Sequence, residues 1–351
     1  MDIASVKSIA ELDQYLDEHG LAGSWRRRAG GTPAGAPKTD ALIWKAAEYQ
    51  EALRRAGEVV SMDQTGALAG QMAGRKQITK LGFGVQVLMP GEVAEAHRHT
   101  QAGLRFIVKG NPKAVMVVEG EAFPMEDGDL ITTPWWAWHD YRNDGDEPVY
   151  WLDSLDLHFA RLSHMFREVY EQPMQPLASA AGHSMNVYGK LRPSWIKSPL
   201  PTPPYRYRWG DTIAALEAIR EREGGPDPFD GHTVAYTHPI TNGPTVPTLS
   251  GAVQLLPPRF VTQAHRHNCT TAYFVVQGEG ATTIDGEPVE WATGDIFRVP
   301  PWRMHQHENG GSQDAILYRV TDEPTMRAWG FYREGTVDPT GSSNRVPDRI
   351  A

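Results

Sequence analysis

The sequence has almost no cysteine and no long hydrophobic run. Cys269 is the single cysteine among 351 residues, so no disulfide can form within the chain and a reducing compartment is permitted. No uninterrupted apolar stretch approaches the length that spans a membrane. The first twenty residues are charged and lack the apolar core of a secretory signal. These absences predict a cytoplasmic protein with no membrane partner.

Basic charge is also scarce. The 34 lysines and arginines are outnumbered by 43 acidic residues, which gives a net charge of −9, and no basic stripe interrupts this excess. The balance argues against nucleic acid as a partner. Length and a hydrophobic content of 40% fit a globular chain of two domains. The 27 prolines and 34 glycines favour many short elements joined by turns.

Hydrophobic periodicity predicts a few helices in a chain that otherwise reads as strands. Helical spacing occurs over Ile9–His19 and over Asp40–Ala56, where Asp40 is a suitable N-cap, and a third helix is predicted over Thr212–Glu223. Elsewhere, short β-like runs are punctuated by Gly, Pro and Asp. The predicted segments are a helical N-terminal arm (1–76), a first β domain (77–158), a mixed connector (159–232), a second β domain (233–335) and a polar, poorly packed tail (336–351).

The two β domains share one histidine pattern, and such an internal repeat is a strong indicator of fold. The string EAHRHTQAG in the first half matches QAHRHNCTT in the second. Further along, each half reads Gly-Asp, then Pro-x-Trp-x-x-His, then Asn four residues later. The alignment relates His97, His99 and His139 of the first half to His265, His267 and His305 of the second.

Histidines in this arrangement are suited to metal binding. Alternation along a strand places both residues of His-x-His on one face, and a neighbouring strand of a closed barrel can add the third imidazole. Three neutral nitrogens suit Fe, Mn, Zn, Ni or Cu and leave coordination positions open, as a catalytic site requires. We expect a catalytic metal on His97, His99 and His139. The set His265, His267 and His305 either binds a second metal or is a remnant, and Cys269 should share the face of His267.

The two blocks resemble the cupin motifs. Gly91, His97, His99 and Gly110 fit the first motif, and Gly128, Pro134, His139 and Asn143 fit the second. The resemblance implies a mainly β bicupin, with two double-stranded β-helix (jelly-roll) barrels, a helical N-terminal arm and a mixed connector. Gly103 stands where many cupins carry a glutamate ligand, Tyr273 falls nearest to that position in the second half, and Trp136 and Trp302 replace a motif glycine. Without the carboxylate, the metal keeps its full charge and favours an anionic, chelating substrate.

A narrower resemblance is to the gentisate 1,2-dioxygenase family, with its relatives that cleave salicylates and 1-hydroxy-2-naphthoate. The strings HRHTQAGLRF, TPWWAWHDYRND and WLDSLD carry the resemblance, which covers most of the chain. It implies a homotetramer with Fe(II) in the first barrel, O2 as co-substrate and a small aromatic hydroxycarboxylate as substrate. Family members open the ring between the carboxyl- and hydroxyl-bearing carbons, in aromatic degradation. A 2-hydroxybenzoate can chelate the metal through one carboxylate oxygen and the phenolate, which leaves a position for O2.

Three further residues are candidates for substrate binding. Arg105, six residues after His99, is expected on the same strand face as the histidines, where it can pair with the substrate carboxylate. The competing interpretation of Arg105 is a surface ion pair. Gln86 and Gly84, on the preceding strand, match pocket positions of the family, and Gln86 can hydrogen-bond the same carboxylate. For Gln86 the pocket role and a role outside the pocket are equally open.

Tyr141 is where the chain departs from the family pattern. Gentisate-cleaving members have His-x-His where this chain has His139-Asp140-Tyr141. The second of those histidines, with the aspartate that matches Asp153, serves the 5-hydroxyl of the substrate. A tyrosine is larger and is no base at neutral pH, but it can donate a hydrogen bond to a nitro or halide group. The substitution favours a 5-substituted salicylate, above all 5-nitrosalicylate, over gentisate.

Other interpretations stay open. Gentisate is the alternative substrate. Isomerase, decarboxylase and oxalate-type bicupins usually retain the glutamate that Gly103 lacks. The alternative from another class is a non-catalytic bicupin that stores or senses a ligand; such proteins usually lose metal histidines, and the N-terminal arm shows no basic recognition helix. The arm itself could cover the pocket or a subunit interface, while His158 and His307 are expected to be solvent or packing residues.

Overall fold

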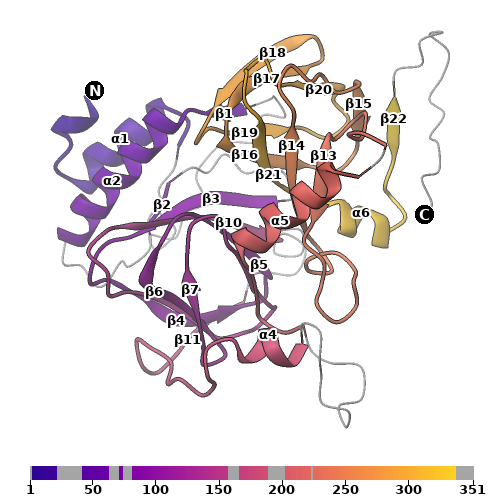
Figure 1. The fold of residues 1–351 in the computed structure, drawn as a ribbon. Helices are drawn as coiled ribbons and strands as arrows, with labels where there is room; N and C mark the ends of the chain where they lie inside the picture. Colours follow the sequence, from indigo (N-terminus) through magenta and orange to yellow (C-terminus); the bar gives the residue numbers. More distant parts are fainter. Residues whose placement is uncertain are drawn as a thin grey trace. The chain divides into compact units, whose positions relative to one another are not determined.

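The computed structural model describes residues 2–21, 42–62, 71–73, 81–156, 166–188, 202–222 and 224–336. Strands predominate in these ranges, and none of the helices found there is both long and apolar enough to cross a membrane. The described residues divide into two compact units (Figure 1). The first takes most residues up to 209 together with 237–246, and the second takes 42–46, 210–236 and 247 onward. The predicted tail and His158 lie outside the described residues.

The first unit consists of two antiparallel sheets, with strand orders β12-β8-β5-β10-β3-β2 and β11-β4-β9-β6-β7. Ile107, Met116 and Trp151, from strands of both sheets, are fully buried in one core. The strands are β2 (Gln71–Ala73), β3 (Leu81–Leu88), β4 (Val93–His99), β5 (Gly103–Lys109), β6 (Asn111–Val118), β7 (Glu121–Met125), β8 (Leu130–Thr133), β9 (His139–Asn143), β10 (Val149–Asp156), β11 (Arg167–Val169) and β12 (Tyr205–Tyr207).

The second unit repeats this topology. Its sheets run β1-β19-β16-β21-β14-β13 and β18-β17-β20-β15-β22, so β19-β16-β21-β14 corresponds to β8-β5-β10-β3. Tyr273, Trp291 and Phe297 form part of its core. The strands are β1 (Leu42–Trp44), β13 (His232–Ala235), β14 (Ser250–Leu256), β15 (His265–His267), β16 (Thr271–Gln277), β17 (Glu279–Ile284), β18 (Glu287–Ala292), β19 (Ile296–Val299), β20 (His305–Glu308), β21 (Ala315–Thr321) and β22 (Glu334–Thr336).

The helices are short and lie outside the barrels' sheets. They are η1 (Ile3–Ser5), α1 (Ile9–Glu18), α2 (Ala46–Met62), α4 (His183–Tyr188), α5 (Trp209–Arg220) and α6 (Glu323–Ala328). The predicted helix Ile9–His19 is confirmed by α1, where Ser8 caps the first turn by accepting from the Glu11 N–H. The predicted connector helix Thr212–Glu223 is present as α5, but it begins three residues earlier, so Asp211 lies in its first turn and does not open it. Asp129 Oδ1 instead accepts from the Trp209 N–H at 2.8 Å.

The prediction of a helix over Asp40–Ala56 is wrong at its start. Leu42–Trp44 instead form β1, antiparallel to β19 with Trp44 opposite Ile296. Helix α2 begins at Ala46, whose backbone N–H donates to Asp295 Oδ1 at 2.7 Å. Strand pairing thus overrides local helix propensity at Leu42–Trp44. The carboxylate at the start of α2 comes from Asp295 and not from Asp40, the N-cap suggested by the sequence. Asp40 itself lies outside the described residues.

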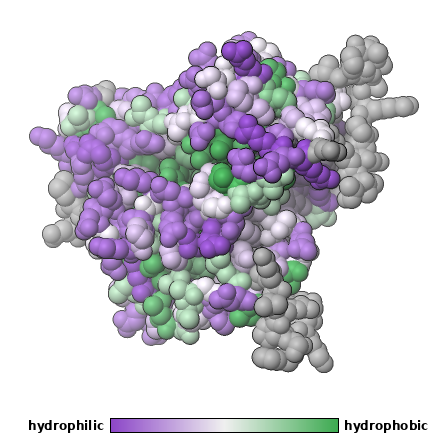
Figure 2. Space-filling view, viewed as in Figure 1, coloured by the Kyte–Doolittle hydropathy of each residue, from purple (hydrophilic) through white to green (hydrophobic). Residues whose placement is uncertain are grey.

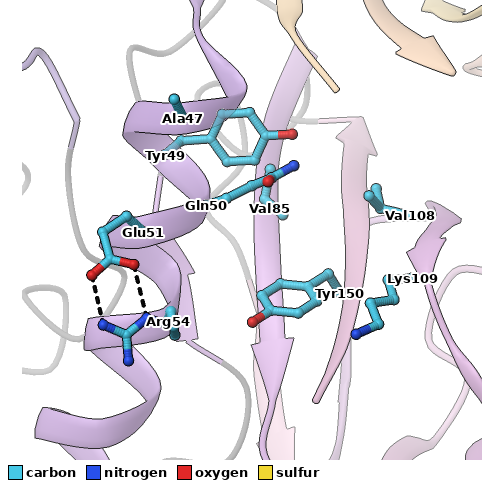
Figure 3. A pocket seen from close by; sticks show the side chains of 9 residues that line it. All are labelled: Ala47, Tyr49, Gln50, Glu51, Arg54, Val85, Val108, Lys109 and Tyr150. Atoms are coloured by element: carbon cyan, nitrogen blue, oxygen red, sulfur yellow. Dashed lines mark hydrogen bonds and ion pairs between the residues drawn. The ribbon is translucent and has the colours of Figure 1, made fainter. Parts of the chain in front are cut away.

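Helix α2 packs on the outer face of the first unit's larger sheet. A cavity of about 440 Å³ lies between the helix and part of this sheet (Figure 3). It is lined by Ala47, Tyr49, Gln50, Glu51 and Arg54 from the helix and by Val85, Val108, Lys109 and Tyr150 from β3, β5 and β10. Val85 faces this cavity, so its neighbours Gly84 and Gln86 face the barrel interior. Helix α2 therefore lies on the side of this sheet opposite to Gly84 and Gln86. On the face drawn in Figure 2 hydrophilic residues predominate, as expected when most apolar side chains lie in the two cores.

Candidate active site

The three histidines of the first barrel converge as predicted. His97 and His99 lie on β4, and His139 lies on β9, directly opposite His97 in the strand pairing. One candidate ligand nitrogen from each ring lies within 4.8 Å of the others. The ring centroids are 4.4 to 5.7 Å apart. The same-face expectation for His-x-His is thereby confirmed.

The hydrogen bonds of these rings determine which nitrogen can bind a metal. Each Nδ1 lies 2.8 to 2.9 Å from a backbone carbonyl, and because a carbonyl only accepts, each Nδ1 must carry the proton. Each Nε2 then keeps its lone pair. Nε2 of His139 is buried and has no hydrogen-bond partner, which is costly for an acceptor. A divalent transition metal would satisfy this atom, so the donor set fits such an ion.

Burial and neighbouring charges keep His99 and His139 neutral. Burial, followed by the charges of Arg105 and His97, lowers the pKa of His99 to about 3. Burial, with repulsion from the other two histidines and Arg105, lowers the pKa of His139 well below its usual value. Neutral imidazole is the form that binds metals, so no proton has to be displaced at neutral pH.

The predicted substrate residues form one cluster beside the histidines. Arg105 Nε lies 3.0 Å from the Tyr141 hydroxyl and 3.1 Å from Asp153 Oδ1. Gln86 Nε2 donates to Asp153 Oδ2 at 3.2 Å, and Gly84 stands opposite Asp153 in the pairing of β3 with β10. Arg105 is 2% exposed, which excludes the interpretation as a surface ion pair.

Arg105 lies on a different strand from the histidines with which it was expected to share a strand face. It lies on β5, in the other sheet from β4, because the turn after His99 separates the two strands. Gly103 makes room for it: a Cβ on Gly103 would lie 1.2 Å from Arg105 Nη1 and 2.3 Å from Cζ. A glutamate at this position and the observed arginine therefore exclude each other. Nη1 is buried without a hydrogen-bond partner, so it is a free donor in the pocket.

The charges in this cluster are stable at neutral pH. Burial opposes the charge of Arg105, but attraction to Asp153 and Tyr141 outweighs it, so the pKa of Arg105 is raised. Burial raises the pKa of Tyr141 to about 12, which keeps this residue a neutral phenol. The pocket thus presents one fixed guanidinium to whatever lies at the histidines.

The second set of histidines converges in the same way. One candidate ligand nitrogen from each of His265, His267 and His305 lies within 4.8 Å of the others. Cys269 lies where predicted, with Sγ 3.1 Å from His267 Nδ1. Strand register makes Thr271 the counterpart of Gly103 and Tyr273 the counterpart of Arg105, so Tyr273 does not hold the glutamate position.

His307 belongs to this second site and was underestimated from the sequence. It is fully buried, with Nδ1 2.8 Å from Thr282 Oγ1, and it occupies the place that Tyr141 has in the first barrel. Its signal was the spacing His305-x-His307, the same His-x-His that gentisate-cleaving relatives carry in their first barrel. The ion pair that Asp230 forms with Arg319, at 2.6 Å in the same unit, was also missed. No local motif surrounds either residue in the sequence.

Comparison with known proteins identifies the family. Residues 84–155 and 252–321 match the model of the cupin domain. A gentisate 1,2-dioxygenase of Haloferax sp is 43% identical over 266 residues, which cover 72% of this chain and 73% of that protein. The chain belongs to the gentisate 1,2-dioxygenase family.

Two further members of this family are informative. A 5-aminosalicylate 1,2-dioxygenase of Comamonas sp is 37% identical over 83% of this chain and 80% of its own. The crystal structure of a salicylate 1,2-dioxygenase from Pseudaminobacter salicylatoxidans superposes with a TM-score of 0.75 at 27% identity, over 93% of this chain and 97% of that one. The predicted family and the mainly β bicupin fold are both confirmed.

Proposed function

We propose that the first barrel is the active site of an Fe(II)-dependent, extradiol-type dioxygenase that opens a 2-hydroxybenzoate. Cleavage would fall between the carboxyl- and hydroxyl-bearing carbons, and both atoms of O2 would enter the product. The observation that carries this proposal is the buried, unpartnered Nη1 of Arg105 in the same barrel as three convergent histidines. A cation close enough to act on His99 and His139 favours a ligand that brings its own negative charge to the metal.

The protein's own residues orient the substrate. Fe(II) on His97, His99 and His139 would supply a Lewis acid that lowers the pKa of a coordinating phenol, and a redox centre for O2. Arg105 pairs with the substrate carboxylate, and its own orientation is held by Asp153 and Tyr141. Because this cluster is buried, water is excluded and each of its electrostatic contacts is strengthened.

The finer proposal concerns the substituent on carbon 5 of the ring. Tyr141 stands where gentisate-cleaving relatives have a histidine, and its pKa of about 12 prevents it from taking a proton from a 5-hydroxyl. In the structure the Tyr141 hydroxyl oxygen accepts from Arg105 Nε, so its own proton stays available to a nitro or halide group, while the residue supplies no base for a 5-hydroxyl. We propose a 5-substituted salicylate, with 5-nitrosalicylate as the leading case; the 5-aminosalicylate-cleaving relative supports this class.

Two further points rest on the family resemblance. We propose that the enzyme is a homotetramer and works in the cytoplasm, in the degradation of aromatic compounds. Light scattering of the purified protein tests the first point, since a monomer or dimer would contradict it. Fractionation of cells that express the natural gene tests the second.

Oxygen uptake tests the function. Enzyme loaded anaerobically with Fe(II) is supplied in parallel with gentisate, salicylate, 5-aminosalicylate and 5-nitrosalicylate. We expect oxygen uptake with 5-nitrosalicylate and 5-aminosalicylate to exceed the uptake with gentisate. Dominant uptake with gentisate would keep the family reaction and refute the 5-substituent proposal. No uptake with any of the four, from enzyme that retains iron, would favour the non-catalytic alternative.

A further inference from the structure

The second barrel carries a partly buried charge pair that differs in arrangement from the fully buried pair in the first. Strand register places Tyr273 where the first barrel has Arg105, and Arg319 where it has Asp153. The carboxylate comes instead from Asp230, in the loop before β13, which pairs with Arg319 at 2.6 Å. Both barrels thus contain an arginine–carboxylate pair beside three histidines, built from non-equivalent positions.

The two carboxylates also reach their sites from different elements. In the first barrel Asp153 lies on β10, opposite Arg105 on β5. In the second, Asp230 follows Phe229, whose ring centroid lies 5.3 Å from that of His265. Asp230 therefore approaches the second set of histidines from a loop that borders His265.

Several buried polar atoms of the second barrel have no partner. His305 is 1% exposed and His307 is fully buried, and in each the Nε2 atom makes no hydrogen bond. Gln254, the counterpart of Gln86, is fully buried with neither its amide nitrogen nor its amide oxygen paired. Leaving such groups unsatisfied is expensive, so the unpaired Nε2 atoms of His305 and His307, whose rings lie 5.7 Å apart within the histidine cluster, indicate a ligand site.

Large side chains limit what the second site can hold. Tyr273 is 1% exposed and stacks on Phe297 with ring centroids 4.8 Å apart, and its ring also lies 5.0 Å from that of His307. The first barrel has no aromatic ring at the position of Tyr273, but an arginine folded over Gly103. Space and charge in the second barrel therefore suit a metal ion with water and disfavour an anionic aromatic ring.

We infer that the second barrel is an independent site for a divalent transition metal, bound by His265, His267 and His305, with Asp230 as the carboxylate that balances its charge. Asp230 lies outside the group of mutually close ligand atoms, so it acts beside the metal ligands and not as one of them. This site goes beyond the proposed reaction: it holds a metal without binding the aromatic substrate.

Metal titration separates the two sites. Apo-protein is titrated anaerobically with Co(II), followed by calorimetry and by the visible spectrum of the bound ion. We expect two Co(II) ions per chain in the wild type, one in His139→Ala, one in His305→Ala and none in the double variant. A His139→Ala protein that is folded by circular dichroism yet binds no Co(II) would overturn the inference. His265→Gln provides a milder second variant, which should also bind a single ion.

Charge and substrate selectivity are tested on the same variants. In the His139→Ala background, Asp230→Asn should weaken Co(II) binding by about 10- to 100-fold, the range typical for groups that support metal ligands. Asp314→Asn is the matched control, because its carboxylate pairs with Arg220 in the same unit, away from the histidines. Salicylate should change the Co(II) spectrum of His305→Ala but not that of His139→Ala. An equal response in both variants, or equal affinities of Asp230→Asn and Asp314→Asn, would contradict the assignment.

Discussion

Replacing Gly103 by alanine tests how the pocket is built. The added Cβ would lie 1.2 Å from Arg105 Nη1 and 2.9 Å from Nη2, so the guanidinium has to leave its position. The arginine is fully buried, and its Nε is held by Tyr141 and Asp153, so a shift of the guanidinium breaks these two contacts. We therefore expect a single methyl group to act as if the arginine had been removed from the substrate carboxylate.

The magnitude follows from the interaction that is lost. A hydrogen bond to a charged group contributes about 1.5 to 3 kcal/mol. At about 1.4 kcal/mol for each factor of ten, the KM for a salicylate should rise by roughly 10- to 150-fold. Metal content should not change, because the three atoms nearest to a Cβ at position 103 all belong to Arg105 and none to a histidine.

The assay is steady-state oxygen uptake, combined with iron content and thermal unfolding of each variant. Gly210→Ala is the matched control, since a Cβ there meets no atom within 4 Å and its backbone carries no positive φ. In the Arg105→Ala background, Gly103→Ala should cause little further loss, because its target is gone. Equal losses from Gly103→Ala in the presence and absence of Arg105 would refute the reasoning.

Four other outcomes are expected. His139→Ala should abolish turnover and remove one metal per chain, and a chelator that strips iron from the wild type should stop oxygen uptake reversibly; activity that survives either treatment would contradict the assigned site. Tyr141→His should raise activity towards gentisate relative to 5-nitrosalicylate, and an unchanged ratio in the assay would contradict the specificity argument. Because the pKa of Tyr141 is raised to about 12, the substrate affinity of the wild type, measured against pH, should show no step from tyrosine ionisation between about pH 7 and 10. The Tyr141→His variant should add a titration in or below that range. Asn143→Ala should destabilise the first barrel by about 2 to 4 kcal/mol in a denaturant titration, because its fully buried amide bonds Leu88 O, Glu147 O and the Gly145 N–H; a loss below about 0.5 kcal/mol would contradict this.

The repeated histidine frame was enough to predict the fold and the convergence of three histidines in each barrel. His-x-His fixes the face on which two ligands lie, and a matching late histidine in both halves restricts the pairing of the strands. Such periodic features depend on neighbours in sequence, so they can be read without a structure. The same holds for helix α1, whose cap and apolar spacing are local.

Features that depend on tertiary contact were missed. Strand β1 exists because the edge of β19 is available to pair with it, and nothing within the sequence Leu42–Trp44 announces that partner. Arg105 was expected on the strand of His99 but lies on the next one, because the sequence did not reveal the turn that separates β4 from β5. That Gly103 leaves space for the guanidinium also depends on a contact that only the structure shows. Asp230 approaches its histidines from the connector, at a distance in sequence that no motif spans.

Incorporation of labelled oxygen tests the central claim most directly. Fe(II)-loaded wild-type protein is supplied with 5-nitrosalicylate under 18O2, and the product is analysed by mass spectrometry. The account predicts a ring-opened product that carries both labelled atoms, formed by the wild type and absent with His139→Ala. An intact ring, a ring-opened product without label, or the same product from His139→Ala would contradict ring cleavage at the first barrel, whereas loss of one label is expected if the ketone oxygen of the product exchanges with water.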